Sequence, residues 1–208
     1  MVNSPQKQKM IDDFLKELEA YNSHYVYLSD LVSICEYFCN YDFEKSKAPN
    51  SMRIIDAACV DTMMIEFAKF YENNEDAKSI QTLLKKCLDE GNLALFQNQA
   101  QVQTKINEFN DKIEKDKYIS TGINTIKERR DKYLAHNDSK YFVDQTKDDS
   151  YLPMYKLWIM KDFIKEVIYF LYAELGGNTD SLKKTIYNDD IKNIEKWEYE
   201  ISHRNQGF

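Results

Sequence analysis

Apolar residues recur at every third or fourth position along most of the chain, which is the period of an amphipathic helix. The first apolar stripe comprises Ile11, Phe14, Leu15 and Leu18. It follows Ser4–Pro5, a pair typical of a helix start. A second helical stretch is predicted at about residues 25–41. It either continues the first helix after a bend near Asn22–Ser23 or forms a separate helix.

Residues 51–71 are apolar on almost every side, which is typical of a helix at the centre of a bundle. A short helix is predicted at about residues 77–88, followed by a loop at 89–92. The same periodicity predicts four further helices, at about residues 102–113, 119–134, 153–175 and 189–203. The polar segments 43–51 and 137–152 are predicted to be loops.

The helix at 153–175 has clear signals at both ends, because Pro153 precedes it and Gly176–Gly177 follows it. The residues predicted to face the core from this helix are Trp158, Ile159, Phe163, Val167, Phe170 and Leu171. No internal repeat or linker divides the chain. We therefore predict an all-α fold, a bundle of six or seven helices. It is expected to form a single domain over residues 1–208, with 188–208 as a C-terminal helical extension.

The composition changes this picture only in part. The net charge of −7 disfavours a large nonspecific nucleic-acid surface, because phosphate contacts need clustered Lys and Arg. Residues 112–132 differ from the acidic chain as a whole. They contain seven basic and four acidic residues, which gives a local charge of +3. Either a small basic site or an ordinary solvated helix face explains this segment.

The four cysteines lie in apolar helical contexts, where a free thiol behaves as a small buried hydrophobe. Cys35 and Cys39 have no second ligand pair at zinc spacing, so we expect neither a metal nor a cofactor. The N-terminal segment has no signal-peptide pattern. The most apolar run, residues 167–173, is too short to span a bilayer. These features predict a soluble cytoplasmic protein in a reducing compartment that does not contact membranes.

An arginine interrupts the apolar rhythm of the predicted helix at 119–134. Ile119, Ile123 and Ile126 are followed by Arg130 where an apolar residue is due. A guanidinium on a core-facing stripe needs a partner. Three explanations remain open: an ion pair with a buried acid such as Asp56 or Asp61, an interface with a second subunit, or a cleft that holds an anion.

Helix geometry restricts how a nearby histidine can join this arginine. A regular helix turns about 100° per residue, so Arg130 and His136 lie about 120° apart, whereas Arg129 and His136 nearly share a face. Arg130 reaches His136 only if the helix ends or distorts first, or if a second copy supplies one of them. Asn137–Asp138 is a typical helix stop and favours such a distortion.

The stretch from Arg130 to Asp138, RDKYLAHND, resembles the signature of HEPN domains, which is an arginine followed by four to six residues and a histidine. With Ala135 and Asp138, it is similar to the abortive-infection U-type (AbiU-like) branch of that superfamily. The resemblance covers about ten residues in detail. It implies a metal-independent endoribonuclease of a phage-defence or toxin–antitoxin system, and a homodimer in which the two motifs meet at the interface.

The residue types suit this chemistry. The RNA 2′-hydroxyl is the nucleophile, histidine can act as base or acid near neutral pH, and a guanidinium stabilises charge on the phosphoryl oxygens. One histidine cannot be base and acid at once, so we infer that a dimer brings two copies of His136 together. The catalytic candidates are therefore Arg130 and His136, with Arg129 as the competing arginine. The supporting candidates are Asp131, Lys132, Tyr133 and Asp138.

Two other functions are compatible with the same residues. The first is a non-catalytic HEPN-like module that binds nucleotide, RNA or a cognate partner protein such as an antitoxin. The second is a structural helical dimer in which Arg130 is only an ion-pair partner. Tyr133 can stack on an RNA base, or simply pack in the core or at an interface. Asp131 is placed to orient Arg130 or His136, Lys132 to attract phosphate, and Asp138 to end the helix.

Overall fold

The computed structural model describes residues 4–46, 48–73, 77–131 and 152–184. Within these ranges it contains seven α-helices, two 3-10 turns and no strand. The prediction of an all-α bundle of six or seven helices is confirmed. The predicted helix at 189–203, and the loop at 137–152 except Leu152, lie outside the described residues.

The longest element is α1 (Ser4–Cys39), a single helix of 36 residues. It resolves the alternative left open by the sequence, because Asn22–Ser23 lies within it without a break. Asn22 is buried, and its amide donates to the carbonyl oxygen of Lys183 (3.0 Å). A polar residue that the pattern suggested as a bend thus anchors a distant segment to the helix.

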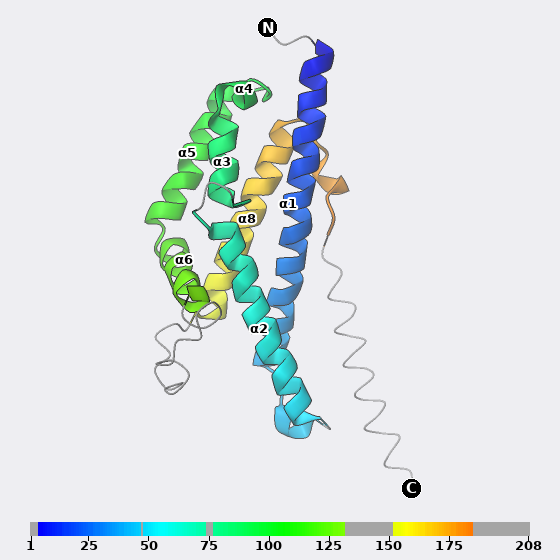
Figure 1. Ribbon diagram of the computed structural model, residues 1–208, viewed down its shortest axis with the longest axis vertical. Coiled ribbons are helices and arrows are strands. Elements are labelled where there is room, and N and C mark those ends of the chain that lie inside the picture. The colour runs from blue at the N-terminus through cyan, green and yellow to red at the C-terminus, as the bar shows by residue number, and fades with distance from the viewer. Residues whose placement is uncertain (1–3, 47, 74–76, 132–151, 185–208) are drawn as a thin grey trace.

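Two later helices pack directly against α1, and the other described helices lie beyond them (Figure 1). The turn η1 (Phe43–Lys45) leads into α2 (Pro49–Tyr71), which crosses the lower half of α1. After α3 (Ile80–Leu88) and α4 (Glu90–Leu93), α5 (Gln99–Lys115) and α6 (Lys117–Arg129) form the far side of the bundle. Finally, α8 (Met154–Glu174) packs against both α1 and α6 and is followed by η3 (Thr179–Ser181).

Polar caps and a glycine set the helix boundaries. Ser79 caps α3 by accepting from the N–H of Thr82, and Asn98 caps α5 by accepting from the N–H of Gln101. At the end of α8, Gly176 adopts a φ of +85°, which an L side chain disfavours. The predicted stop at Gly176–Gly177 is confirmed. The predicted loop at 89–92 is wrong, because Glu90–Leu93 forms α4, a single helical turn.

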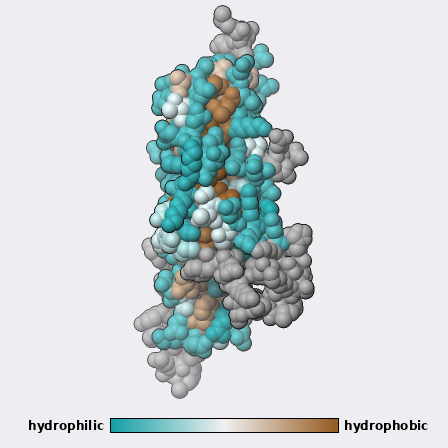
Figure 2. All heavy atoms as spheres, turned by 90° about the vertical axis from the view of Figure 1, so that its left-hand side faces the viewer, coloured by the Kyte–Doolittle hydropathy of each residue, from teal (hydrophilic) through white to brown (hydrophobic). Residues whose placement is uncertain are grey.

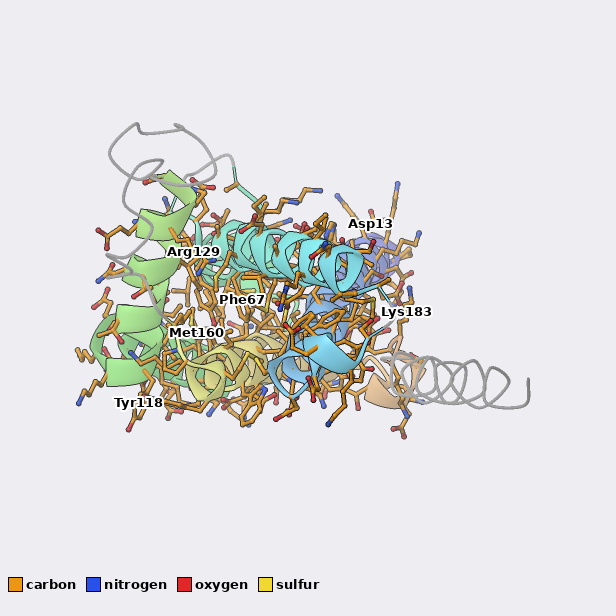
Figure 3. The ribbon with its side chains drawn as sticks, turned by 90° about the horizontal axis from the view of Figure 1, so that it is seen from below. Asp13, Phe67, Tyr118, Arg129, Met160 and Lys183 are labelled. Carbon is orange, nitrogen blue, oxygen red and sulfur yellow. The ribbon has the colours of Figure 1, made fainter. Side chains whose placement is uncertain are left out.

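The core lies between α1, α2, α5 and α8. Phe67 of α2 is completely buried at its centre, between α2 and α8 (Figure 3). The Tyr71 hydroxyl donates to the carbonyl oxygen of Met160 (2.8 Å), and Phe109 and Phe163 meet edge to face at 5.8 Å. Together these contacts join the second half of α2 and the whole of α5 to α8.

Several residues predicted to be buried are exposed. Trp158 lies on the outer face of α8, and Cys39 is exposed at the end of α1. In α2 the first half is not central, since the side chain of Ile54 is 70% exposed. Figure 2 shows apolar side chains at this lower end of the molecule, on a face that is otherwise mainly hydrophilic. The central-helix prediction for residues 51–71 holds only from Met63 onward.

Candidate functional site

Arg130 directly follows α6, so the packing of α6 determines where its side chain lies. The Asp116 carboxylate fixes the start of the helix by accepting from the N–H groups of Tyr118 (2.8 Å) and Ile119 (3.0 Å). The buried stripe of the helix comprises Ile119, Gly122, Ile123 and Ile126. Helical spacing continues this stripe to Arg130, which therefore turns toward the rest of the bundle.

A glycine allows α6 to approach α8 closely. A Cβ atom at Gly122 would lie 2.4 Å from the Sδ atom of Met160, which is itself completely buried. A larger residue here would have to displace the buried end of the Met160 side chain from the contact between α6 and α8. Gly122 is therefore a packing residue that positions the site, and its small size was not recognised in the sequence pattern.

The guanidinium of Arg130 is held between two carboxylates. Its Nη1 atom lies 3.0 Å from Oε1 of Glu72, the residue that ends α2. Its Nε and Nη2 atoms lie 2.8 Å and 2.7 Å from Oδ1 of Asp131. The hydrogen bond with Asp131, followed by the one with Glu72, raises the pKa of Arg130 above its ordinary value, so the side chain is always charged.

The Arg130 side chain remains accessible in this arrangement. It is 27% exposed, and Glu72 is 36% exposed. A guanidinium has five N–H donors, and the contacts to Glu72 and Asp131 involve three nitrogen–oxygen pairs. Within the described part of the chain, these pairs leave two of its N–H donors without a contact. The two carboxylates orient the guanidinium without enclosing it.

The side chain of Arg129 contacts a different acid from that of Arg130, although the two residues are adjacent at the end of α6. Its Nη2 atom lies 4.0 Å from Oδ1 of Asp61, at the limit of an ion pair, and its side chain is half-buried. Figure 3 shows Arg129 at the edge of the bundle, where α6 meets α2. Of the two arginines, only Arg130 is fixed by close contacts to carboxylates on both sides.

These contacts correct the expected ion pair. Neither Asp56 nor Asp61 is the partner of Arg130; Glu72 is, from the C-terminal end of α2. Sequence reasoning missed Glu72 because nothing in the local pattern separates it from other exposed acids. The structure does bring Asp131 to Arg130, as expected for an orienting residue.

The geometry changes immediately after α6. Arg130 and Asp131 lie in a π-helical turn rather than in regular α-helix, so the rotation of about 100° per residue no longer applies beyond Arg129. The other predicted site residues, Lys132, Tyr133, His136 and Asp138, lie outside the described residues.

A pocket of about 330 Å³ adjoins the Arg130 site on the other side of Glu72. Its walls are mainly apolar and come from α1, the end of α2 and the segment before α3. The residues around it include Tyr21, His24, Phe70, Glu72, Ala77 and Lys78. His24 is far from the motif in the sequence, yet it lines the same pocket as Glu72. Only the tertiary fold brings α1 to this position.

The four cysteines are free thiols. Cys35 and Cys87 are buried, and burial raises the pKa of each to about 12. Burial also raises the pKa of Cys39 and Cys59. None of the four is therefore activated as a nucleophile. Among the described residues, no group of His, Cys, Asp and Glu has the arrangement of a metal site.

The described helices also bear on membrane insertion and on the class of the protein. None of them combines the length and the apolar character needed to cross a bilayer.

The all-helical bundle, with Arg130 at the start of an Arg-x5-His motif, is a HEPN-type module of the kind found in abortive-infection systems. A family model described as AbiU2 matches residues 10–194, so the chain belongs to the AbiU2 family of HEPN proteins. No match was found among curated proteins or among solved structures.

Proposed function

We propose that this protein is a metal-independent endoribonuclease of an abortive-infection or toxin–antitoxin system. The observation that supports this most directly is the Arg130 guanidinium, which carboxylates orient while its side chain stays partly open to solvent. A permanently charged group with free donors suits a phosphoryl oxygen in the transition state. The matched family adds the expectation of a histidine partner six residues later, His136.

The proposed reaction uses the RNA as its own nucleophile. A base removes the proton of the 2′-hydroxyl, and the 2′-oxygen attacks the neighbouring phosphorus. The bond from phosphorus to the 5′-oxygen breaks, and an acid protonates that oxygen. The products are a 2′,3′-cyclic phosphate and a free 5′-hydroxyl. One His136 acts as base and a second copy as acid, while Arg130 neutralises the charge on the phosphoryl oxygens.

Wild-type protein is expected to cleave single-stranded RNA in the presence of EDTA. A single 2′-deoxy nucleotide at the cleaved position is expected to block cleavage there, because the nucleophile is missing. The measurement is a denaturing gel with mass analysis of the product ends. Binding without cleavage would instead indicate the non-catalytic module, and a product ending in 3′-hydroxyl would contradict the proposed chemistry.

A homodimer is part of the proposal, and α2 offers a surface for it. Ile54, Ile55 and Ile65 are exposed on α2, and Asp61, the contact of Arg129, lies between them along the helix. Ile54, Ala58, Asp61 and Ile65 follow one another at steps of four, three and four, so they share one face. An apolar face that runs toward the arginines fits a second copy that brings its own motif close.

Replacing both Ile54 and Ile65 by aspartate is expected to convert the dimer to a monomer and to remove RNA cleavage together with it. Both side chains are exposed in the single chain, so the helical content should not change. Light scattering gives the mass, and circular dichroism gives the helicity. A wild-type protein that is monomeric yet active would refute the dimer. Tyr27→Asp, on exposed α1 surface, serves as the control.

A further inference from the structure

The described acids that contact Arg129 and Arg130 offset the positive charge of these two arginines. Arg129 and Arg130 contribute two positive charges, whereas Asp61, Glu72 and Asp131 contribute three negative ones. Nearby charges of both signs cancel at long range, and the whole chain carries −7. A protein that acts on RNA needs attraction to phosphates from another part of its surface.

A cleft of about 420 Å³ between α1, α8 and the segment after η3 has the required charge. Its charged residues are Lys161, Asp162, Lys165, Asp180, Lys183 and Lys184. Four lysines against two aspartates leave +2 in an acidic protein. Hydrogen-bonding groups from Tyr25, Ser29, Tyr169 and Thr179 also border the cleft. We refer to this site as the lysine cleft.

The far wall of the lysine cleft is held in place. The buried Asn22 amide donates to the carbonyl oxygen of Lys183 (3.0 Å), and the neighbouring Leu182 is buried in the core. The preceding turn is capped by Asn178, which accepts from the N–H of Asp180 (3.0 Å). Lys183 and Lys184 therefore extend from a fixed segment, and their exposed ammonium groups are available to a ligand.

The other wall is the helix α8. Lys161 and Lys165 are four residues apart, so they lie on one face about 6 Å apart along the axis. The ammonium of Lys161 is 3.6 Å from the Asp162 carboxylate, a loose pair with a mostly exposed acid. Lys165 lies over the ring of Tyr169, at 5.3 Å. The Lys161 side chain is 20% exposed and so lies partly within the wall, while the acid that it pairs with is 69% exposed and screened by solvent.

The chemistry of this cleft favours a chain of phosphates over a single base or a protein helix. Lysines act as point charges that accept phosphate in many orientations. The phenol of Tyr25 stays protonated, because burial raises its pKa to about 12, and it is a donor. Two lysines from each wall, together with hydroxyl groups that line the same cleft, suit a nucleic-acid backbone.

The lysine cleft and the arginines lie on opposite sides of the bundle. Figure 3 shows Lys183 toward one edge and Arg129 toward the other, with Phe67 between them. We propose that the lysine cleft is a second RNA-binding site, which holds the phosphate backbone of a long single strand away from the place of cleavage. The inference rests on the proposed function in one respect, that RNA is the substrate. It predicts that long RNA uses both sides and that a dinucleotide does not need the cleft.

The experiment compares Lys165→Glu/Lys183→Glu with Lys9→Glu/Lys16→Glu, which changes the net charge equally at exposed positions of α1. Both pairs are placed in the Arg130→Ala background, so that binding is measured without cleavage. The probe is fluorescent poly(U), titrated at several salt concentrations. Loss of two phosphate contacts is expected to weaken binding about tenfold at low salt and to reduce the slope of log K against log salt by about 1.4. The control pair is expected to bind tightly, with an unchanged slope.

Four further results test the proposal. Equal binding by the two double variants would overturn the lysine cleft as an RNA site. If the Lys165→Glu/Lys183→Glu variant loses binding of inorganic phosphate or a mononucleotide but still binds poly(U), the cleft is a site for free phosphates. That result would also overturn the proposal of an RNA site. In the cleavage-competent background, the Lys165→Glu/Lys183→Glu variant should raise KM for poly(U) and leave kcat for UpU unchanged. If wild-type protein cleaves nothing while the cleft variant still loses poly(U), the cleft stands and the proposed nuclease activity fails.

Discussion

Arg130→Ala and His136→Ala are each expected to reduce RNA cleavage by at least about 10²–10³-fold, the usual loss when a group that stabilises transition-state charge is removed. For Arg130 the reason is the loss of a permanently charged group that two carboxylates aim toward solvent. For His136 the reason is the loss of proton transfer. Initial rates on a labelled single-stranded RNA give the measurement. Arg129→Ala is the matched control and should lose no more than about tenfold, since its only contact with a described acid is at 4.0 Å.

The stability of Arg130→Ala separates this prediction from a purely structural role. The ion pair with Glu72 joins side chains that are 27% and 36% exposed, and solvent screens such pairs. The free energy of unfolding is therefore expected to fall by no more than about 1 kcal/mol. Urea titration measures this value. A loss of several kcal/mol, with cleavage unchanged when corrected for the folded fraction, would make Arg130 a structural ion-pair partner.

Phe67→Ala is expected to lower the free energy of unfolding by about 3–5 kcal/mol, the usual cost of truncating a buried phenylalanine. Phe67 is completely buried between α2 and α8, and the cavity left there cannot fill without moving a helix. In a chain of this size the melting temperature should fall by roughly 6–20 °C. Calorimetry or a thermal melt followed by circular dichroism gives the measurement.

Tyr27→Ala is the control for Phe67→Ala. It removes an aromatic side chain of similar size from the exposed face of α1, and we expect a change within about 1 kcal/mol. Equal losses in the two variants would show that the centre of the bundle is not at Phe67. The result also concerns the site, because α2 carries both Asp61 and Glu72.

The sequence predicted most of the helices well because most of them bury a continuous apolar stripe. Ile119, Ile123 and Ile126 marked α6 correctly, and the interruption at Arg130 correctly indicated a partly buried charge with a partner. Periodicity reports which face of a helix is apolar, and that information is local. Helix ends marked by Pro153 and Gly176 were equally predictable, since their conformational preferences are properties of the residues themselves.

The partner of that charge was beyond the sequence. Asp56, Asp61 and Glu72 all lie on or at the end of α2, and only the crossing of α2 with α6 places Glu72 beside Arg130. Trp158 and Ile54 were expected in the core because they are apolar, yet no neighbouring described helix covers them. The lysine cleft could not be predicted either, because it also depends on tertiary contacts. Lys161 and Lys183 line one cleft only because the chain folds back after α8.

The unbroken helix α1 lines both the pocket beside Glu72 and the lysine cleft. His24 borders the pocket beside Glu72, and the very next residue, Tyr25, borders the lysine cleft. Consecutive residues on a rigid rod cannot move independently, so a small roll of α1 about its own axis reshapes both hollows at once. The helix is thus a wall that both hollows share, so a substitution that rotated α1 would change the lining of both.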